Sequence, residues 1–151
     1  MKIAIIAVGG LKEDYWRKSA AEYAKRISAY SKLEIIEIAE ERPGGGVKII
    51  EREGARALNA LRDRDCVAAM CVEGQRMSSE RFARFLEHAV NAPRVVFFIG
   101  GSEGLSVGVK SRADALISFS GMTFPHQMAR VMLLEQIYRA FKIIKNEPYH
   151  K

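Results

Sequence analysis

Five short apolar runs divide the chain, and segments with helical periodicity lie between them. Each run has the length of one buried β-strand, and most of them end at a glycine. They cover residues 3–8, 33–38, 66–72, 95–99 and 115–120. The mixed apolar and polar pattern of 33–38 predicts a strand near the sheet edge. Strands that alternate with helices are typical of an α/β fold with a mainly parallel sheet, here a single domain over residues 1–151.

The intervening segments predict four helices. The first begins near Glu13 and Asp14, whose negative charge favours a helix start, and the second covers 47–61, with Gly54 as a weak point. Ser78 or Ser79 caps the third, which stops at Pro93, and the last runs from His126 to about Lys145. The glycine-rich segment 40–46 predicts a mobile surface loop, since no strand leads into it and no Lys-Ser/Thr pair follows.

The ends of the third, fourth and fifth predicted strands define a candidate ligand site, because ligands gather at the carboxyl ends of parallel strands. Gly100, Gly101, Glu103 and Gly104 follow the fourth strand. Their spacing is neither the dinucleotide fingerprint nor a P-loop, and the glutamate would repel phosphate. The loop therefore favours a pocket for a neutral or cationic ligand, and the alternative is a tight turn before a short capped helix.

The second glycine-bearing loop, at 120–125, follows the fifth strand and exposes backbone groups that can read the edge of an adenine. The last helix is apolar nearly all round, which indicates burial or packing against another copy of the chain. His126 and Arg130 lie one turn apart on this helix and need polar partners or a role. The tail that ends in Tyr149, His150 and Lys151 either frays or reaches into an active site.

Composition narrows the partner and the compartment. The chain has 48% hydrophobic and 28% charged residues, a net charge of +6 and a pI near 9.5, which favour a polyanionic partner such as RNA. A dispersed basic surface is the alternative. No apolar run is long enough to span a membrane, and residues 1–10 are interpreted as a strand rather than a signal peptide. Cys66 and Cys71 show no metal-ligand spacing and are interpreted as free thiols, so we expect a cytoplasmic protein without a metal.

Three motifs in the carboxyl-terminal half together resemble one family. They are Gly-Gly-Ser-Glu-Gly-Leu-Ser at 100–106, Met-Thr-Phe-Pro-His at 122–126 continuing to Arg130, and Tyr-Arg-Ala at 138–140 with Asn-Glu-Pro-Tyr-His at 146–150. The chain is similar over nearly its whole length to the bacterial 23S rRNA pseudouridine N3-methyltransferases of the SPOUT superfamily. This resemblance implies an α/β knot, with the chain threaded into a deep trefoil over about 94–146. It also implies a homodimer.

The resemblance further implies S-adenosylmethionine as cofactor and a pseudouridine in helix 69 of 23S rRNA, in the assembled ribosome, as substrate. The cofactor positions would be Met70, Gly100, Gly101, Glu103, Gly104, Phe119, Ser120, Gly121, Met122, Thr123 and Phe124. The candidates for catalysis are His126, Arg130, Tyr149 and His150, with Arg139 as a phosphate contact. A base must remove the N3 proton, and we expect the tail of one subunit to complete the pocket of the other.

Two positions depart from the family pattern. Ser102 stands where the family often has proline, and Gln127 follows His126 where the family often has His-Pro. Neither departure removes a group that the chemistry needs. The alternatives are a SPOUT methyltransferase for another RNA such as tRNA, a non-catalytic ribosome-binding factor, and a nucleotide-binding oxidoreductase, against which the missing fingerprint argues.

Overall fold

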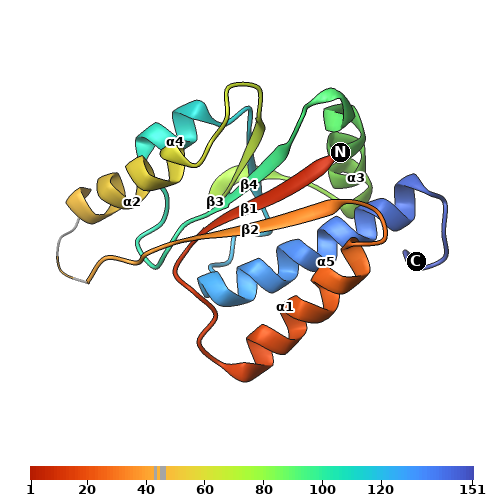
Figure 1. The fold of residues 1–151 in the computed structure, drawn as a ribbon, viewed down its shortest axis with the longest axis horizontal. Coiled ribbons are helices and arrows are strands. Elements are labelled where there is room, and N and C mark those ends of the chain that lie inside the picture. The colour runs from red at the N-terminus through yellow and green to blue at the C-terminus, as the bar shows by residue number, and fades with distance from the viewer. Residues whose placement is uncertain (43, 45–46) are drawn as a thin grey trace.

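A parallel five-stranded sheet forms the centre of the protein (Figure 1). The structure, a computed structural model, describes residues 1–42, 44 and 47–151, so part of the loop predicted over 40–46 lies outside the described residues. The strands are β1 (Lys2–Val8), β2 (Lys32–Ile38), β3 (Cys66–Arg76), β4 (Val95–Ile99) and β5 (Ala115–Ser118). Their order is β2-β1-β4-β3-β5, and every pair is parallel. The predicted α/β class and the edge position of 33–38 are confirmed.

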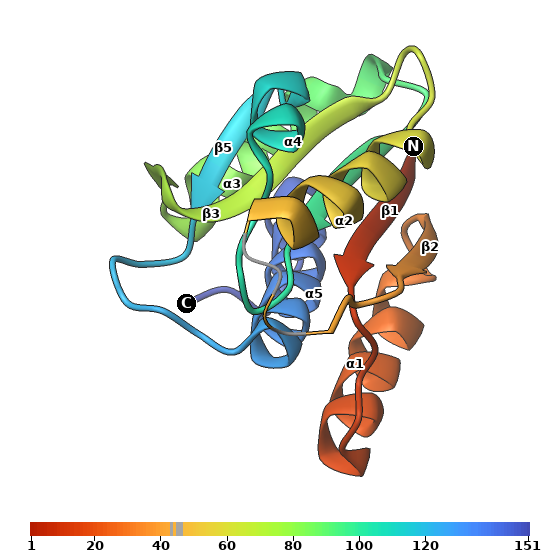
Figure 2. The same cartoon turned by 90° about the vertical axis from the view of Figure 1, so that its left-hand side faces the viewer.

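Helices cover both faces of the sheet (Figures 1 and 2). One face carries α1 (Asp14–Ile27), α3 (Ser79–His88) and α5 (His126–Ile144), and the other carries α2 (Val47–Asn59) and α4 (Val107–Arg112). A short 3-10 turn, η1 (Ala89–Asn91), follows α3. Among the described residues, no helix is both long and apolar enough to cross a membrane.

The two-sided burial explains why the strands are apolar without a break. Along β1, Ile3 and Ile5 pack under α1, α3 and α5, whereas Ile6 packs under α2 and α4. In β4 the neighbours Phe97 and Phe98 divide in the same way. Successive side chains in a strand point to opposite faces, so a strand covered on both faces needs an apolar residue at every position.

Two predicted strand ends are wrong, and close packing explains one of them. The third strand does not end at Val72, because β3 resumes pairing with β5 at Gln75 after a bulge that begins past Met70. Gly74 allows this, since a Cβ there would lie 2.7 Å from the backbone of Ile117. Gly54, predicted as a weak point of α2, is also a close contact, because a Cβ there would lie 2.2 Å from Oγ of Ser106. The fifth strand ends at Ser118, two residues before the predicted end at Ser120. The helix α4 corresponds to the short capped helix that was the alternative interpretation of the glycine loop.

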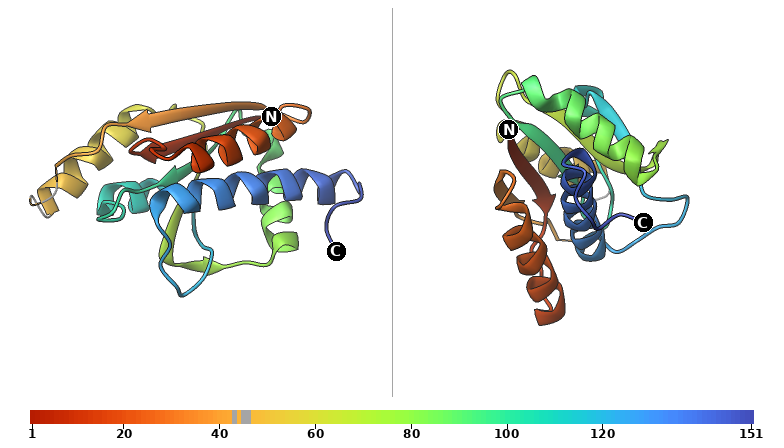
Figure 3. Two further views of the ribbon diagram at one scale, coloured as in Figure 1. Left: turned by 90° about the horizontal axis from the view of Figure 1, so that it is seen from below. Right: turned by 90° about the vertical axis from the view of Figure 1, so that its right-hand side faces the viewer.

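The two edges of the sheet differ in character. At the amino-terminal edge, Arg94 and Asp65, which come directly before β4 and β3, form a buried ion pair. At the carboxyl-terminal edge, the bulge of β3 and the loops that follow β4 and β5 lie beside the beginning of α5 (Figures 2 and 3). The first edge contributes stability, and the second forms a cavity.

Candidate functional site

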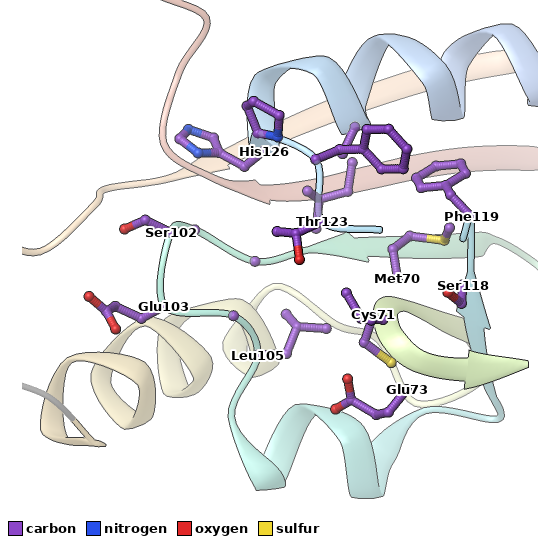
Figure 4. A pocket seen from close by; sticks show the side chains of 18 of the residues that line it. Met70, Cys71, Glu73, Ser102, Glu103, Leu105, Ser118, Phe119, Thr123 and His126 are labelled. Carbon is purple, nitrogen blue, oxygen red and sulfur yellow. The ribbon is translucent and has the colours of Figure 1, made fainter. Parts of the chain in front are cut away.

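A cavity of about 750 Å³ opens at the bulge of β3 and the ends of β4 and β5 (Figure 4). This volume lies in the range of cofactor pockets, roughly 300–1,000 Å³. The wall comes from three loops and the first residues of α5. The lining residues are Met70, Cys71, Val72, Glu73, Ile99, Gly100, Gly101, Ser102, Glu103, Gly104, Leu105, Lys110, Ser118, Phe119, Ser120, Met122, Thr123, Phe124, Pro125, His126 and Ala129.

The loop after β4 is a tight turn that only glycines can form. The Gly104 N–H donates to the Gly101 carbonyl over 3.1 Å, and Gly104 has a φ of +88°. A Cβ on Gly100 would lie 2.5 Å from the Gly104 carbonyl oxygen, which is closer than real Cβ contacts. Ser106 then caps α4, its Oγ accepting from the Val109 N–H over 3.1 Å. Both interpretations of this segment hold: it walls a cavity and it leads into a short capped helix.

The bulge in β3 turns Cys71 and Glu73 toward the cavity. Lys110 of α4 donates to the Glu73 carboxylate, and this hydrogen bond holds the pKa of Glu73 below its usual value. Burial raises the pKa of the Cys71 thiol, so this cysteine stays protonated at neutral pH. Cys66, on the same strand, is also a free thiol.

The loop after β5 presents its backbone to the cavity. Oγ of Ser118 donates to the Ser120 carbonyl over 2.8 Å, and the Met122 N–H donates to Oγ of Ser120 over 3.1 Å. Met122 itself is 73% exposed. Gly121 does not line the cavity and lies against the Arg76 guanidinium, 2.5 Å from where a Cβ would stand.

His126 begins α5 at the cavity wall, directly after Pro125 (Figure 4). Its Nε2 is buried, has no hydrogen-bond partner among the described residues, and lies 3.3 Å from the position of a Cβ on Gly9. A Glu40 carboxylate oxygen lies 3.2 Å from the same position. A buried ring nitrogen without a partner is costly unless a ligand or a proton completes it.

Arg130 does not line the cavity, although it lies one turn from His126. Its side chain is 1% exposed, donates to the Gly9 carbonyl over 2.6 Å and to Glu37 over 2.7 Å, and thereby ties α5 to the ends of β1 and β2. Gln127 makes a second tie, its Oε1 accepting from the Lys12 N–H over 2.8 Å. The glutamine at this departure from the family pattern therefore has a structural partner.

The carboxyl-terminal tail lies away from the cavity of its own chain. Asn146, with a φ of +52°, ends α5 and turns the chain back along the helix. Tyr149 then packs edge-on against Tyr138, with ring centroids 4.8 Å apart, and His150 contacts Glu80 over 2.9 Å. In Figures 1 and 3 the tail lies at the end of α5 opposite to the carboxyl ends of the strands. Neither tail residue lines the cavity.

Eleven of the fifteen predicted site residues thus meet at one cavity: ten cofactor candidates and His126. The four exceptions are Gly121, Arg130, Tyr149 and His150. The sequence analysis missed Cys71, Ile99, Leu105, Lys110 and Ala129. The predicted end of the third strand, at residues 66–72, carried a signal for Cys71, whereas no feature of the sequence pointed to Lys110. Within the described part of the chain, no group of three His, Cys, Asp or Glu side chains is arranged to hold a metal ion.

The fold and the cavity together define an α/β protein with a cavity of cofactor size among glycine-rich loops at the carboxyl-terminal side of its parallel sheet. The chain belongs to the SPOUT methyltransferase family, because the family model described as predicted SPOUT methyltransferase matches residues 1–150. The resemblance drawn from the three motifs is confirmed.

Relatives of this chain extend the comparison over its whole length. A protein of Clostridium perfringens named ribosomal RNA large subunit methyltransferase H 1 is 47% identical, with both chains fully covered. A ribosomal RNA large subunit methyltransferase H of Streptococcus gordonii is 45% identical at the same coverage. A solved structure of a probable methylase family protein from Haemophilus influenzae matches 99% of this chain and 70% of its own with a TM-score of 0.60. At 11% identity, that structure supports the fold alone.

Proposed function

We propose that this protein methylates large-subunit ribosomal RNA, with S-adenosylmethionine as donor and N3 of a pseudouridine in helix 69 of 23S rRNA as acceptor. The observation that carries the proposal is the cavity. Ten of the eleven positions that the family resemblance assigns to the cofactor line this one cavity. The chain is also 47% identical over its full length to a protein named as an rRNA methyltransferase. The proposal includes the trefoil knot over about 94–146, the segment that supplies two of the three loops.

The residues present fit S-adenosylmethionine. Met70, Ile99, Leu105 and Phe119 offer an apolar slot for a planar base. The loop after β5 adds backbone groups that can read the edge of that base. The loop after β4 forms the opposite wall. It needs glycine at position 100, because a Cβ there would collide with the Gly104 carbonyl oxygen across the turn.

The charge of the wall also suits this cofactor. Glu73 and Glu103 bring negative charge to the cavity, and the one lysine in the lining, Lys110, is bound to Glu73. Bound S-adenosylmethionine would supply an electrophilic methyl group on a positively charged sulfur. A wall with net negative charge favours a cation over a phosphate.

The protein's own contribution is to orient the target base and to remove the N3 proton. His126 is the base we favour, because this residue lines the cavity and its buried Nε2 has no hydrogen-bond partner among the described residues. Arg130, committed to Gly9 and Glu37, would position this histidine rather than touch the substrate. Stabilisation of the developing anion then falls to another cation, for which Arg139 at the tail is the candidate.

A second copy of the chain would bring the tail to the cavity. The tail of this chain is docked on α5 and α3, so Tyr149 and His150 would act in the cavity of a partner. In support, Met128 and Met132 of α5 are apolar and only half-buried, and neither packs against the core. A homodimer would cover these residues and build two composite sites. Because its substrate would be the ribosome, the enzyme would work in the cytoplasm.

The deciding experiment is transfer of labelled methyl from S-adenosylmethionine to ribosomes that lack the modification, followed by mapping of the labelled nucleotide. Label at one pseudouridine of 23S rRNA is the expected result. Label in tRNA, or cofactor binding without label in any rRNA, would refute the substrate assignment.

The composite site has a test of its own. His126→Ala and deletion of residues 149–151 should each reduce methyl transfer more than cofactor affinity. An equimolar mixture of the two variants, dissociated and reassociated, should regain activity. Half of the dimers should then contain one subunit of each variant, and each such dimer has one intact site, with His126 from the truncated subunit and the tail from the other. A mixture as inactive as its components would refute the shared site.

A further inference from the structure

Glu135 lies in the middle of α5 and accepts hydrogen bonds from two of the residues assigned to the composite site. Its Oε1 accepts from Nε and Nη2 of Arg139, over 2.9 and 2.7 Å, and from the Tyr149 hydroxyl over 3.1 Å. Its Oε2 accepts from Nε2 of Gln136 over 2.7 Å. With its side chain only 18% exposed, this carboxylate is surrounded by donors rather than by water.

The partners of Glu135 also bind one another. The Arg139 guanidinium lies over the Tyr149 ring, 4.6 Å from its centroid, and Nη1 of Arg139 lies 3.3 Å from Nδ1 of His150. Removal of the carboxylate would leave the guanidinium and the phenol without the acceptor that fixes their relative orientation. A guanidinium held by two hydrogen bonds to one carboxylate oxygen and by a stacked ring has little freedom, which is how active sites limit misplacement.

We propose that Glu135 is a positioning residue, which presents Arg139 and Tyr149 to the partner's cavity in one fixed orientation. This inference rests on the proposed function and deepens it. The attachment of the tail does not depend on Glu135, because Glu147 accepts from Tyr30 and from Lys142, over 2.5 and 2.7 Å, and His150 contacts Glu80. Glu135 therefore acts on the orientation of two side chains rather than on the position of the tail.

A consequence for the chemistry follows from the same contact. Burial, and next the hydrogen bond to Glu135, raise the pKa of Tyr149 to about 12. At neutral pH the phenol is thus protonated and donates to the carboxylate. Tyr149 then serves as a hydrogen-bond donor, and removal of the N3 proton falls to another group, for which His126 is the candidate.

The test compares Glu135→Gln with Glu22→Gln, in both of which one carboxylate becomes an amide of the same shape. Glu22 pairs with Arg26 at the same helical spacing as Glu135 with Arg139, but on exposed α1. Glu135→Gln should lower the turnover number for methyl transfer by about 10- to 100-fold, the range expected when a catalytic group is misplaced by about an ångström. Its cofactor dissociation constant should stay within about twofold of wild type, and Glu22→Gln should match wild type in both quantities.

Two further readouts separate positioning from a general loss of structure. Glu135→Gln combined with Tyr149→Phe should lose less activity than the product of the two single losses, because both changes break the contact between Glu135 and Tyr149. Spectrophotometric titration should show Tyr149, identified by the transition that is missing in Tyr149→Phe, ionising at lower pH in Glu135→Gln than in wild type.

The outcomes distinguish this inference from the function on which it rests. A wild-type enzyme without methyl transfer to ribosomes overturns the proposed function and the inference together. An active wild type with Glu135→Gln at wild-type turnover overturns the inference alone. Additive losses in the double variant, or an unchanged tyrosine titration, do the same.

Discussion

The buried ion pair at the amino-terminal edge of the sheet gives a prediction whose size follows from the structure. Arg94 is 2% exposed and its partner Asp65 is 1% exposed. The guanidinium donates to Asp65 from Nε over 3.1 Å and from Nη2 over 2.5 Å, and also to the Ala60 carbonyl and to Glu34. Arg94→Met keeps most of the side-chain volume but leaves a buried carboxylate with one protein donor, the Arg62 N–H.

The expected loss is large because a buried charge without its partner retains its full desolvation cost. Removal of one member of such a pair destabilises a protein by about 3–5 kcal/mol. For a chain of this size, 1 kcal/mol lowers the melting temperature by about 2–4 °C, so Arg94→Met should melt about 6–20 °C below wild type. Arg62→Met is the matched control, since Arg62 lies 4.0 Å from the same Glu34 but is 61% exposed, and it should cost at most about 1 kcal/mol.

The pH dependence gives the loss a signature. Burial alone would raise the pKa of Asp65, but the hydrogen bonds from Arg94 and from the Arg62 backbone hold this pKa below its usual value in the folded protein. The pair therefore stabilises the fold above the unfolded pKa of about 3.9, and this contribution is lost as pH falls toward the lower folded pKa. Without Arg94, burial raises the pKa of Asp65, so the deficit of Arg94→Met should be greatest at neutral pH and shrink in acid.

Urea unfolding followed by circular dichroism, at several pH values between 3 and 7, measures these free energies. The reasoning is wrong if Arg94→Met loses no more stability than Arg62→Met at pH 7. It is also wrong if the deficit of Arg94→Met grows as the pH is lowered. Asp65→Leu with Arg94→Met should be less destabilised than the two single losses added, since neither buried charge remains.

Three smaller changes test the cavity and its support. Gly100→Ala places a methyl group 2.5 Å from a backbone oxygen across the turn, and calorimetry should show cofactor binding weakened by about tenfold or more. Gly108→Ala is the control: its Cβ would have its nearest neighbour at 3.5 Å, so cofactor binding should be unchanged. Gly54→Ala drives a Cβ into Ser106 at 2.2 Å and should cost about 1–3 kcal/mol of unfolding free energy, although alanine favours helices. Glu103→Gln should weaken the binding of S-adenosylmethionine, whose sulfur is positively charged, by about two- to fivefold more than that of S-adenosylhomocysteine, whose sulfur is neutral. This factor corresponds to an exposed charge contact of about 0.5–1 kcal/mol. Equal losses of affinity for both molecules would argue against an electrostatic role of Glu103.

Local patterns predicted most of the architecture. Residues 3–8 of β1 and all of β4 are apolar because helices cover both faces, and an unbroken apolar run shows this directly. Helix starts were predicted from residues that act within one turn, as Ser78 does when its side chain accepts from the Arg81 N–H. The edge position of β2 followed from its polar residues.

The boundaries that were wrong depend on contacts with distant segments. Nothing local distinguishes Gly74 as the point where β3 approaches Ile117 of β5, or Gly54 as the point where α2 approaches Ser106. A local pattern treats a glycine as a point where its own helix or strand is weakened. The close approach that the missing side chain allows involves a distant segment, which the local pattern does not identify.

The sequence by itself determined the five strands, their parallel arrangement and the loops at which a ligand would bind, because periodicity and glycine position act within a few residues. Only the tertiary structure decided what each polar side chain does. Arg130 and His126 share one face of α5, yet the first is bound to Gly9 and Glu37 and the second reaches the cavity. Partners more than 90 residues apart in the chain meet only when the sheet and its helices close, so no local pattern encodes the pairing.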